Sequence, residues 1–174
     1  DQEREWVTMG AGFLIGDGRQ VATVGHVLSG AEAVRVKLAD GEWRAAEVAT
    51  LNLALDVAVL RIEGAPGQPV TIAPSLPLQG HTVATIGAPH GWGFSLSAGL
   101  VSRYGETAGM FLDQPMMQIA GPIIGGNSGG LVFNARGEAV GMVSHGKETF
   151  NQVVPIGRVL DVASGERTRH SPIL

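Results

Sequence analysis

The sequence predicts an all-β protein made of two six-stranded antiparallel β-barrels and a short C-terminal helix. The chain of 174 residues combines 44% hydrophobic residues with 26 glycines, a composition that suits many short strands joined by tight turns. A proline-rich stretch near residue 70 separates the apolar runs into two groups. Closing each group into a barrel would leave no sheet edge unpaired.

The first barrel is expected from residues 1–64, where short apolar runs alternate with turn residues. Asp40-Gly41 is a typical hairpin turn, because these residue types accept the backbone torsions that a tight turn requires. Asp56 precedes a strongly apolar strand and is expected at its entrance, with a partly buried carboxylate. Five strands of this barrel are expected over residues 6–15, 21–24, 33–38, 43–48 and 57–62.

The connector is expected over residues 65–80. Four prolines fall between residues 66 and 77. Proline disfavours both a helix interior and a central strand, because it lacks the backbone N–H that either structure would use.

The second barrel is expected from residues 81–156, and residues 157–174 are expected to form a short helix, over 158–164, and a tail. A repeated pattern supports the pairing of two similar barrels. Residues 12–26 resemble residues 130–145, each an apolar run, a glycine-ended turn and a second run that ends on histidine. The expected strands of this barrel cover residues 82–86, 95–102, 131–133, 139–143 and 152–156, and residues 110–119 lead to the next loop.

The hexapeptide Gly125 to Gly130, GGNSGG, contains the candidate nucleophile Ser128. Glycines on both sides let the backbone turn tightly beneath an incoming carbonyl group. The backbone N–H groups of Gly126 and Ser128 could then point at one spot and bind a developing oxyanion. Taken alone, the hexapeptide is equally consistent with a glycine-rich turn between two strands, so a base and an orienting carboxylate are needed.

Two further residues match these needs. His26 ends an apolar run and is expected at the end of a strand, while Asp56 is expected at the beginning of another. A lone histidine or aspartate in such a place is usually structural. Histidine, aspartate and serine in this chain order, each at the boundary of an element, are unlikely to be accidental. The order resembles that of the chymotrypsin-like enzymes, and this resemblance implies a catalytic triad with Ser128 as nucleophile, His26 as base and Asp56 as its orienting partner.

Six segments resemble the trypsin-like serine peptidases, and more closely their HtrA-like branch: TVGHV, DVAVLRI, IGAPHG, SAGLVS, GGNSGG and GMVSHG. They follow the family's order from about residue 10 to residue 160. The chain departs from the family pattern at Val24-Gly25, before the histidine, and at Leu131, where a proline commonly follows the two glycines. Neither departure involves a reacting atom.

The resemblance implies a chymotrypsin-like fold and a serine endopeptidase that acts on protein or peptide substrates through an acyl-enzyme intermediate. It also implies that Ser144 hydrogen-bonds the triad aspartate. The alternatives are a non-catalytic peptide-binding module and an esterase, since one fold supports several functions. An extracytoplasmic location and a homo-oligomer are implied by the resemblance alone.

The resemblance also assigns a substrate pocket to the segments before and after the nucleophile. No acidic side chain is present among these residues, so a buried lysine or arginine head group would lack a charge partner. We therefore expect a small or medium aliphatic residue on the acyl side of the cleaved bond. The pocket residues implied are Pro122, Ile123, Ile124, Ser144, His145 and Gly146.

Charge and cysteine content argue against several other kinds of site. The net charge is −4 and the basic residues are scattered, so nucleic acid is not an expected partner. The absence of cysteine excludes disulfides and thiolate sites. The five histidines form no close pair in the sequence, so we expect neither a metal nor another cofactor. No apolar run approaches the length of a membrane span, and the first five residues are polar or charged, so neither membrane insertion nor a signal peptide is expected.

Overall fold

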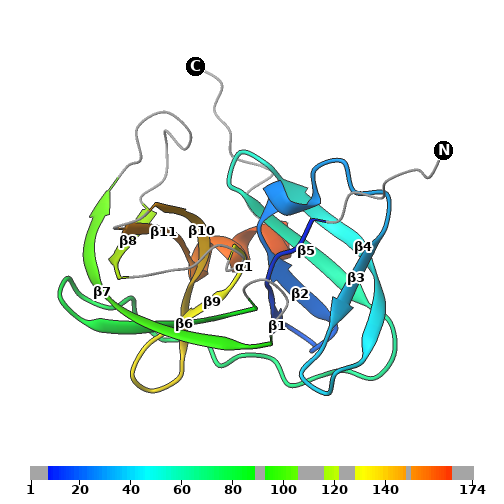
Figure 1. Ribbon diagram of the computed structural model, residues 1–174, viewed down its shortest axis with the longest axis horizontal. Helices are drawn as coiled ribbons and strands as arrows, with labels where there is room; N and C mark the ends of the chain where they lie inside the picture. The colour runs from blue at the N-terminus through cyan, green and yellow to red at the C-terminus, as the bar shows by residue number, and fades with distance from the viewer. Residues whose placement is uncertain (1–7, 89–92, 106–115, 122–127, 148–149, 166–174) are drawn as a thin grey trace.

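The computed structural model describes residues 8–88, 93–105, 116–121, 128–147 and 150–165. Two antiparallel β-sheets lie side by side, and one helix, α1 (Ile156–Ser164), packs between them (Figure 1). The predicted all-β class and the short C-terminal helix are therefore confirmed. Among the described residues, no helix has the length and apolar character needed to cross a membrane.

The N-terminal sheet has the strand order β1-β2-β5-β4-β3. Its centre is β5, which pairs with β2 and β4 and is buried over most of its length. The strands are β1 (Phe13–Ile15), β2 (Gln20–Thr23), β3 (Val34–Lys37), β4 (Trp43–Asn52) and β5 (Val57–Ile62).

This sheet differs from the expected barrel in two respects. It contains five strands within the described residues, where six had been expected, and its first strand starts at Phe13 rather than near residue 6. Residues 8–12 form no strand. Part of the reason is that the Ala11 N–H donates to the carbonyl of Ser128 at 2.9 Å, so this segment contacts the other sheet's loop.

The C-terminal sheet is a closed barrel of six antiparallel strands in the order β10-β11-β8-β7-β6-β9, as the sequence predicts. Buried and more exposed residues alternate along β6, which is the pattern of a strand with one face in a core. The strands are β6 (Thr82–Gly87), β7 (Ser95–Gly105), β8 (Met116–Ala120), β9 (Leu131–Phe133), β10 (Ala139–Lys147) and β11 (Phe150–Pro155). The two copies of the repeated sequence pattern each form a hairpin, β1–β2 in the N-terminal sheet and β9–β10 in the C-terminal barrel.

Helix α1 begins at Ile156, two residues earlier than expected, directly after Pro155. Proline suits this place because a helix start leaves its backbone N–H unpaired in any case. The helix ends at Gly165, whose φ of +76° closes the last turn in the left-handed region that glycine adopts readily.

The largest buried cluster is shared by both sheets and the helix. Its residues come from β1, β2 and β5 on one side, and from β8, β10 and β11 on the other. Because α1 fills the space between the sheets, their relative position depends on its packing. The members of the cluster are Phe13, Ile15, Ala22, Val24, Val57, Met116, Ala139, Met142, Val154, Ile156, Val159 and Val162.

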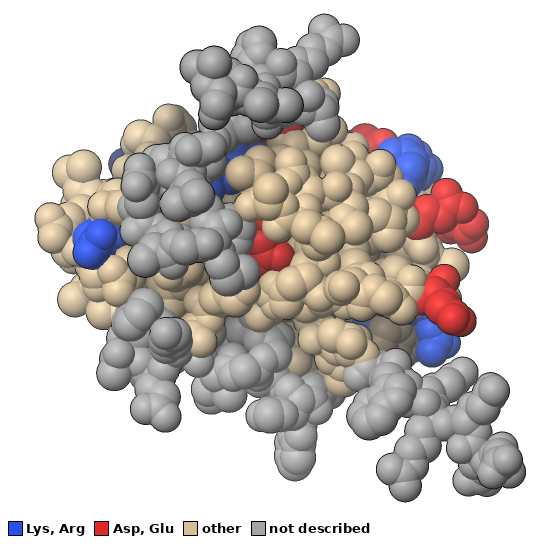
Figure 2. Space-filling model, turned by 90° about the horizontal axis from the view of Figure 1, so that it is seen from above, with Lys and Arg blue, Asp and Glu red and all other residues tan. Residues whose placement is uncertain are grey.

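Acidic and basic side chains are interspersed on the described surface. In Figure 2 most of the described residues that are visible are uncharged, and side chains of both signs lie near the right-hand margin. Arg61 pairs with Asp17 at 3.2 Å, and Arg44 with Asp40 at 3.7 Å. Such exposed pairs contribute little to stability.

Candidate active site

Asp56 lies immediately before β5, as predicted, and is only 2% exposed. Its φ of +54° makes it the one non-glycine residue with positive φ in the described part of the chain. Such a conformation costs about 1–3 kcal/mol and persists only where the surroundings impose it. Here the Asp56 N–H donates to the carbonyl of Leu53 at 3.3 Å, and the Leu55 N–H donates to Asn52 Oδ1 at 3.0 Å.

The Asp56 carboxylate accepts hydrogen bonds from two segments that are far apart in the sequence. The His26 backbone N–H reaches Oδ1 at 2.9 Å, and the ring Nδ1 lies 2.9 Å from Oδ2 and 3.0 Å from Oδ1. The Ser144 hydroxyl donates to Oδ2 at 2.6 Å. The contact with Ser144 that the resemblance implied is therefore present.

These contacts fix the tautomers of the site. An ionised carboxylate only accepts hydrogen bonds, so His26 Nδ1 carries the proton and Nε2 is the ring's acceptor. The single proton of Ser144 is donated to Asp56, so Ser144 Oγ accepts from His145 Nδ1, 2.8 Å away. The arrangement leaves His26 ready to accept a proton at Nε2.

His26 lies in the 3-10 helix η1 (Gly25–Leu28), three residues beyond the end of β2, rather than at the strand end that had been expected. Its side chain is 41% exposed. A Cβ atom on the buried Gly25 would lie 3.2 Å from Leu51 and 3.3 Å from Leu53, so the absence of a side chain at position 25 lets this turn pack closely against the segment before Asp56.

Ser128 lies on a turn that hydrogen-bonds to the segment before β1 and to β10. Its carbonyl accepts from the Ala11 N–H at 2.9 Å, and the next residue, Gly129, donates to the Val143 carbonyl at 2.7 Å. A Cβ atom on Gly10 would lie between Val27 and the Ser128 carbonyl, at 3.2 and 3.3 Å. Ser128 thus lies near the turn that carries His26.

The Ser128 side chain makes no hydrogen bond among the described residues, so none joins its Oγ to His26. Catalytic hydrogen bonds are often long in the absence of substrate. The other predicted members of the nucleophile loop, Pro122, Ile123, Ile124 and Gly126, lie outside the described residues.

A β-bulge in β10 directs Ser144 toward Asp56. The register between β10 and β11 shifts between Val143 and His145, which leaves Ser144 as the extra residue. Ser144 is fully buried, whereas the adjacent Gly146 is exposed.

The model for the trypsin-like peptidase domain matches residues 10–142, the greater part of the chain. The chain belongs to the trypsin-like peptidase family. The order of His26, Asp56 and Ser128 and the contacts of Asp56 agree with this assignment.

Relatives within the trypsin-like peptidases are similar to the chain over nearly its whole length. A probable periplasmic serine endoprotease, DegP-like, from Pseudomonas savastanoi pv. phaseolicola is 33% identical over 94% of this chain and 36% of its own. A protein of the same description from Halomonas elongata is 33% identical over 90% of this chain and 34% of its own. The chain thus spans about a third of the length of these relatives.

Solved structures of trypsin-like peptidases share the fold. The HtrA-type protease AlgW with a decapeptide has a TM-score of 0.84 and 25% identity, over 90% of this chain and 51% of its own. A serine endoprotease from Yersinia pestis has a TM-score of 0.81 and 26% identity, over 90% of this chain and 56% of its own. Within the trypsin-like peptidase family, the chain is thus similar to the protease domains of HtrA-type proteins.

His145 is the residue whose place the sequence did not reveal. The resemblance assigned it to the substrate pocket, but its ring stacks on that of His26, with centroids 4.9 Å apart and 23° between the planes. Its Nδ1 lies 3.8 Å from Asp56 Oδ2. The only available signal was its position directly after Ser144.

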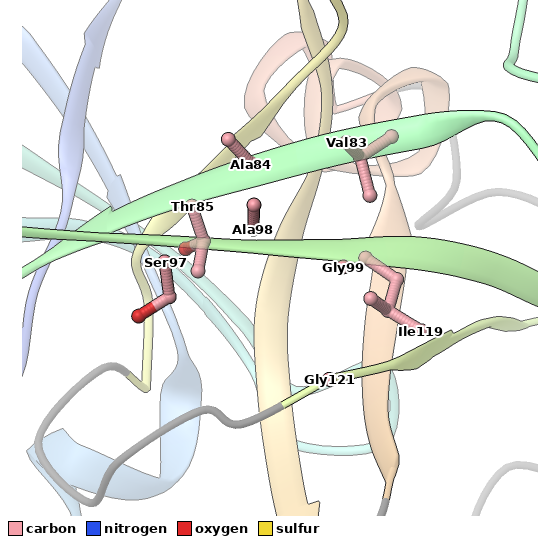
Figure 3. Close-up of a pocket in the computed structure, with 8 residues that line it drawn as sticks. All are labelled: Val83, Ala84, Thr85, Ser97, Ala98, Gly99, Ile119 and Gly121. Carbon is pink, nitrogen blue, oxygen red and sulfur yellow. The ribbon is translucent and has the colours of Figure 1, made fainter.

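A small cavity of about 10 Å³ lies between β6, β7 and β8, and Figure 3 shows the side chains that line it. It has room for about one water molecule. The Thr85 hydroxyl on its wall is buried and has no hydrogen-bond partner in the described structure. None of the predicted triad residues lines this cavity.

Proposed function

We propose that this domain is an endopeptidase in which Ser128 attacks the peptide carbonyl, His26 removes the serine proton and Asp56 holds His26 in position. The observation that carries the proposal is the pair of hydrogen bonds from His26 and Ser144 to the buried Asp56 carboxylate. They orient the imidazole and set its tautomer, which a binding module would not require. Membership of the trypsin-like peptidases supports the same roles.

The chemistry follows from this tautomer. As Ser128 Oγ attacks, its proton passes to His26 Nε2, and the resulting imidazolium is stabilised by the Asp56 carboxylate. His26 then delivers the proton to the leaving amine, which leaves an acyl-enzyme on Ser128. A water molecule, deprotonated by the same Nε2, hydrolyses that ester and restores the serine. The backbone N–H groups of Gly126 and Ser128 are proposed to stabilise the oxyanion in both steps.

The proposed substrates are proteins or peptides with a small or medium aliphatic residue on the acyl side of the cleaved bond. The resemblance assigns the pocket to Pro122–Ile124 and Ser144–Gly146, none of which carries an acidic side chain. Full burial of a branched aliphatic side chain contributes about 1.5–3 kcal/mol, whereas a lysine or arginine would lose its hydration without gaining a charge partner. A peptide ligand is also named for the similar AlgW structure.

An extracytoplasmic location is proposed because the DegP-like relatives are named as periplasmic. A homo-oligomer remains an expectation from the family resemblance.

Labelling with a fluorophosphonate, which reacts with activated serines, tests the assignment. We expect the wild-type chain to be labelled and to degrade casein, and Ser128→Ala to do neither, since loss of such a nucleophile can cost about a million-fold in kcat. Ser102→Ala, on β7, is the matched control and should behave as wild type. A wild-type chain that is not labelled would indicate a binding module, and ester hydrolysis without peptide hydrolysis would indicate an esterase.

The cleavage sites in a denatured protein mixture test the substrate preference. Mass spectrometry should find mainly valine, alanine or leucine before the cut. A dominance of lysine or arginine there would show that the pocket has been misplaced.

A further inference from the structure

Three side chains that bind metal ions in other proteins meet at the candidate active site. His26, Asp56 and His145 each offer one ligand atom, and these atoms all lie within 4.8 Å of one another. They come from η1, the residue before β5, and β10. The group could not be predicted from the sequence, because its members are far apart along the chain.

The distances from Asp56 to the two histidines suit a small tetrahedral ion. Zinc binds imidazole nitrogen and carboxylate oxygen at about 2.0–2.2 Å, so two ligands of one tetrahedral ion lie about 3.4 Å apart. Asp56 Oδ2 lies 2.9 Å from His26 Nδ1 and 3.8 Å from His145 Nδ1. These two distances bracket the value required, and two nitrogens with one oxygen leave a fourth position for water.

The charge of the group also favours a cation. The Asp56 carboxylate is 2% exposed, and its side-chain partners in the described structure are two histidines and the neutral Ser144 hydroxyl. No lysine or arginine of the described residues pairs with it. A buried carboxylate without a fixed positive partner gains stability from a bound cation.

The two histidine side chains of the group are partly open to solvent. The side chains of His26 and His145 are 41% and 40% exposed. Because their rings are stacked, the lone pairs of both Nδ1 atoms do not converge on one point, and the His145 ring must turn to share an ion with His26. Its exposed position allows that movement without displacing a core residue.

We propose that His26, Asp56 and His145 form a binding site for Zn²⁺ that switches the peptidase off. The ion takes the Nδ1 positions of both rings and one Asp56 oxygen. When the ion binds Nδ1 of a neutral imidazole, the ring's one proton resides on Nε2 and none is released. When it binds a protonated imidazole, the Nδ1 proton is released. His26 Nε2 consequently holds a proton and cannot accept that of Ser128. The inhibition rests on the proposed function, but the binding does not.

Calorimetry measures the binding separately from catalysis. In the Ser128→Ala chain, which cannot digest itself, we expect one Zn²⁺ per chain. Adding His145→Gln should weaken binding by at least about tenfold, since even loss of an outer-shell partner of a metal site costs about 10- to 100-fold in affinity. The matched control adds His81→Gln, which changes an exposed histidine whose side chain accepts a hydrogen bond from Leu78 N, and should leave the affinity unchanged. Equal binding with and without His145, or no binding at all, would overturn the site.

Peptide hydrolysis measures the inhibition. Each variant's rate is divided by its own rate in metal-free buffer, so that any direct effect of the substitution cancels. Zn²⁺ should inhibit the wild-type and His81→Gln chains, a chelator should restore them, and His145→Gln should need at least about tenfold more Zn²⁺. Mg²⁺ should not inhibit, because it prefers six oxygen ligands. Inhibition by Zn²⁺ that is unchanged in His145→Gln would overturn the proposal. A wild-type chain without peptidase activity would instead contradict the proposed function, and the calorimetric test of zinc binding would still hold.

Discussion

Gly129 allows the turn that carries Ser128 to approach the first sheet. Its φ is +88°, and a Cβ atom at this position would lie 2.0 Å from the Ala11 carbonyl oxygen and 2.6 Å from Thr23 Oγ1. Both neighbours belong to the segments before His26. The absence of a side chain at a single residue therefore determines how closely the candidate nucleophile and base can lie.

Gly129→Ala should lower the free energy of unfolding by about 2–5 kcal/mol, because the left-handed conformation costs about 1–2 kcal/mol and the overpacking about 1–3 kcal/mol more. Fluorophosphonate labelling should fall as well. Gly137→Ala provides the matched control, since Gly137 also has positive φ (+76°) but a Cβ atom there meets nothing within 4 Å. Urea unfolding measures both losses, and equal losses would show that the close approach at Gly129 is unimportant.

At the scale of elements, strand β7 is tied to the connector by Tyr104. Its hydroxyl donates to the Pro77 carbonyl, and its ring packs against the core of the C-terminal barrel. Burial raises the pKa of Tyr104 above its usual value of 10.0. The folded state therefore favours the neutral phenol, whose stabilising effect is complete below the unfolded pKa and is lost as the pH rises through the folded one.

Tyr104→Phe should cost about 1 kcal/mol of stability at neutral pH, the net contribution of one hydrogen bond. Above about pH 10 the wild-type chain should lose this advantage, so that the two stability curves converge. Urea unfolding at several pH values measures the difference. The chain has one tyrosine, so its tyrosinate absorbance reports Tyr104 alone. A folded-state titration at or below that of the urea-unfolded chain would contradict the prediction.

The elements were largely predictable because local patterns determine them. Asp40-Gly41 indicates the β3–β4 hairpin, and the apolar run after Asp56 indicates β5. The absence of a strand over residues 8–12 was not predictable, because their apolar pattern suits a strand. Only the structure shows that the Ala11 N–H donates to the Ser128 carbonyl instead of to a neighbouring strand.

The candidate site was predictable where chemistry restricts the residue type. Few side chains other than those of His26, Asp56 and Ser128 could fill their proposed roles. The place of His145 depends instead on the bulge at Ser144 and on the packing of β10 against the first sheet. Both are long-range features, and neither has a local sequence signal.

At the scale of the whole molecule, α1 packs against both sheets. Val159 is fully buried, and it belongs to the cluster that contains residues of both sheets. A change there should therefore affect stability and the proposed active site together.

Val159→Ala should reduce the free energy of unfolding by about 2 kcal/mol through lost burial and the cavity that remains. Val48→Ala on β4 removes the same atoms from a side chain that is 45% exposed, and should change stability by no more than about 0.5 kcal/mol. Thermal unfolding and labelling of Ser128 are the measurements. Equal effects of the two substitutions would mean that α1 does not stabilise the contact between the sheets.

The hydrogen bond between Ser144 and Asp56 joins residues 88 positions apart, and it affects the order in which the molecule can be assembled. A ribosome adds about 5–20 residues per second, so Ser144 is made roughly 4–18 seconds after Asp56. During that interval His26 has already been synthesised, but the Ser144 hydroxyl that donates to the Asp56 carboxylate has not. The charged centre of the proposed active site is thus completed late in translation, after the candidate nucleophile itself has been synthesised.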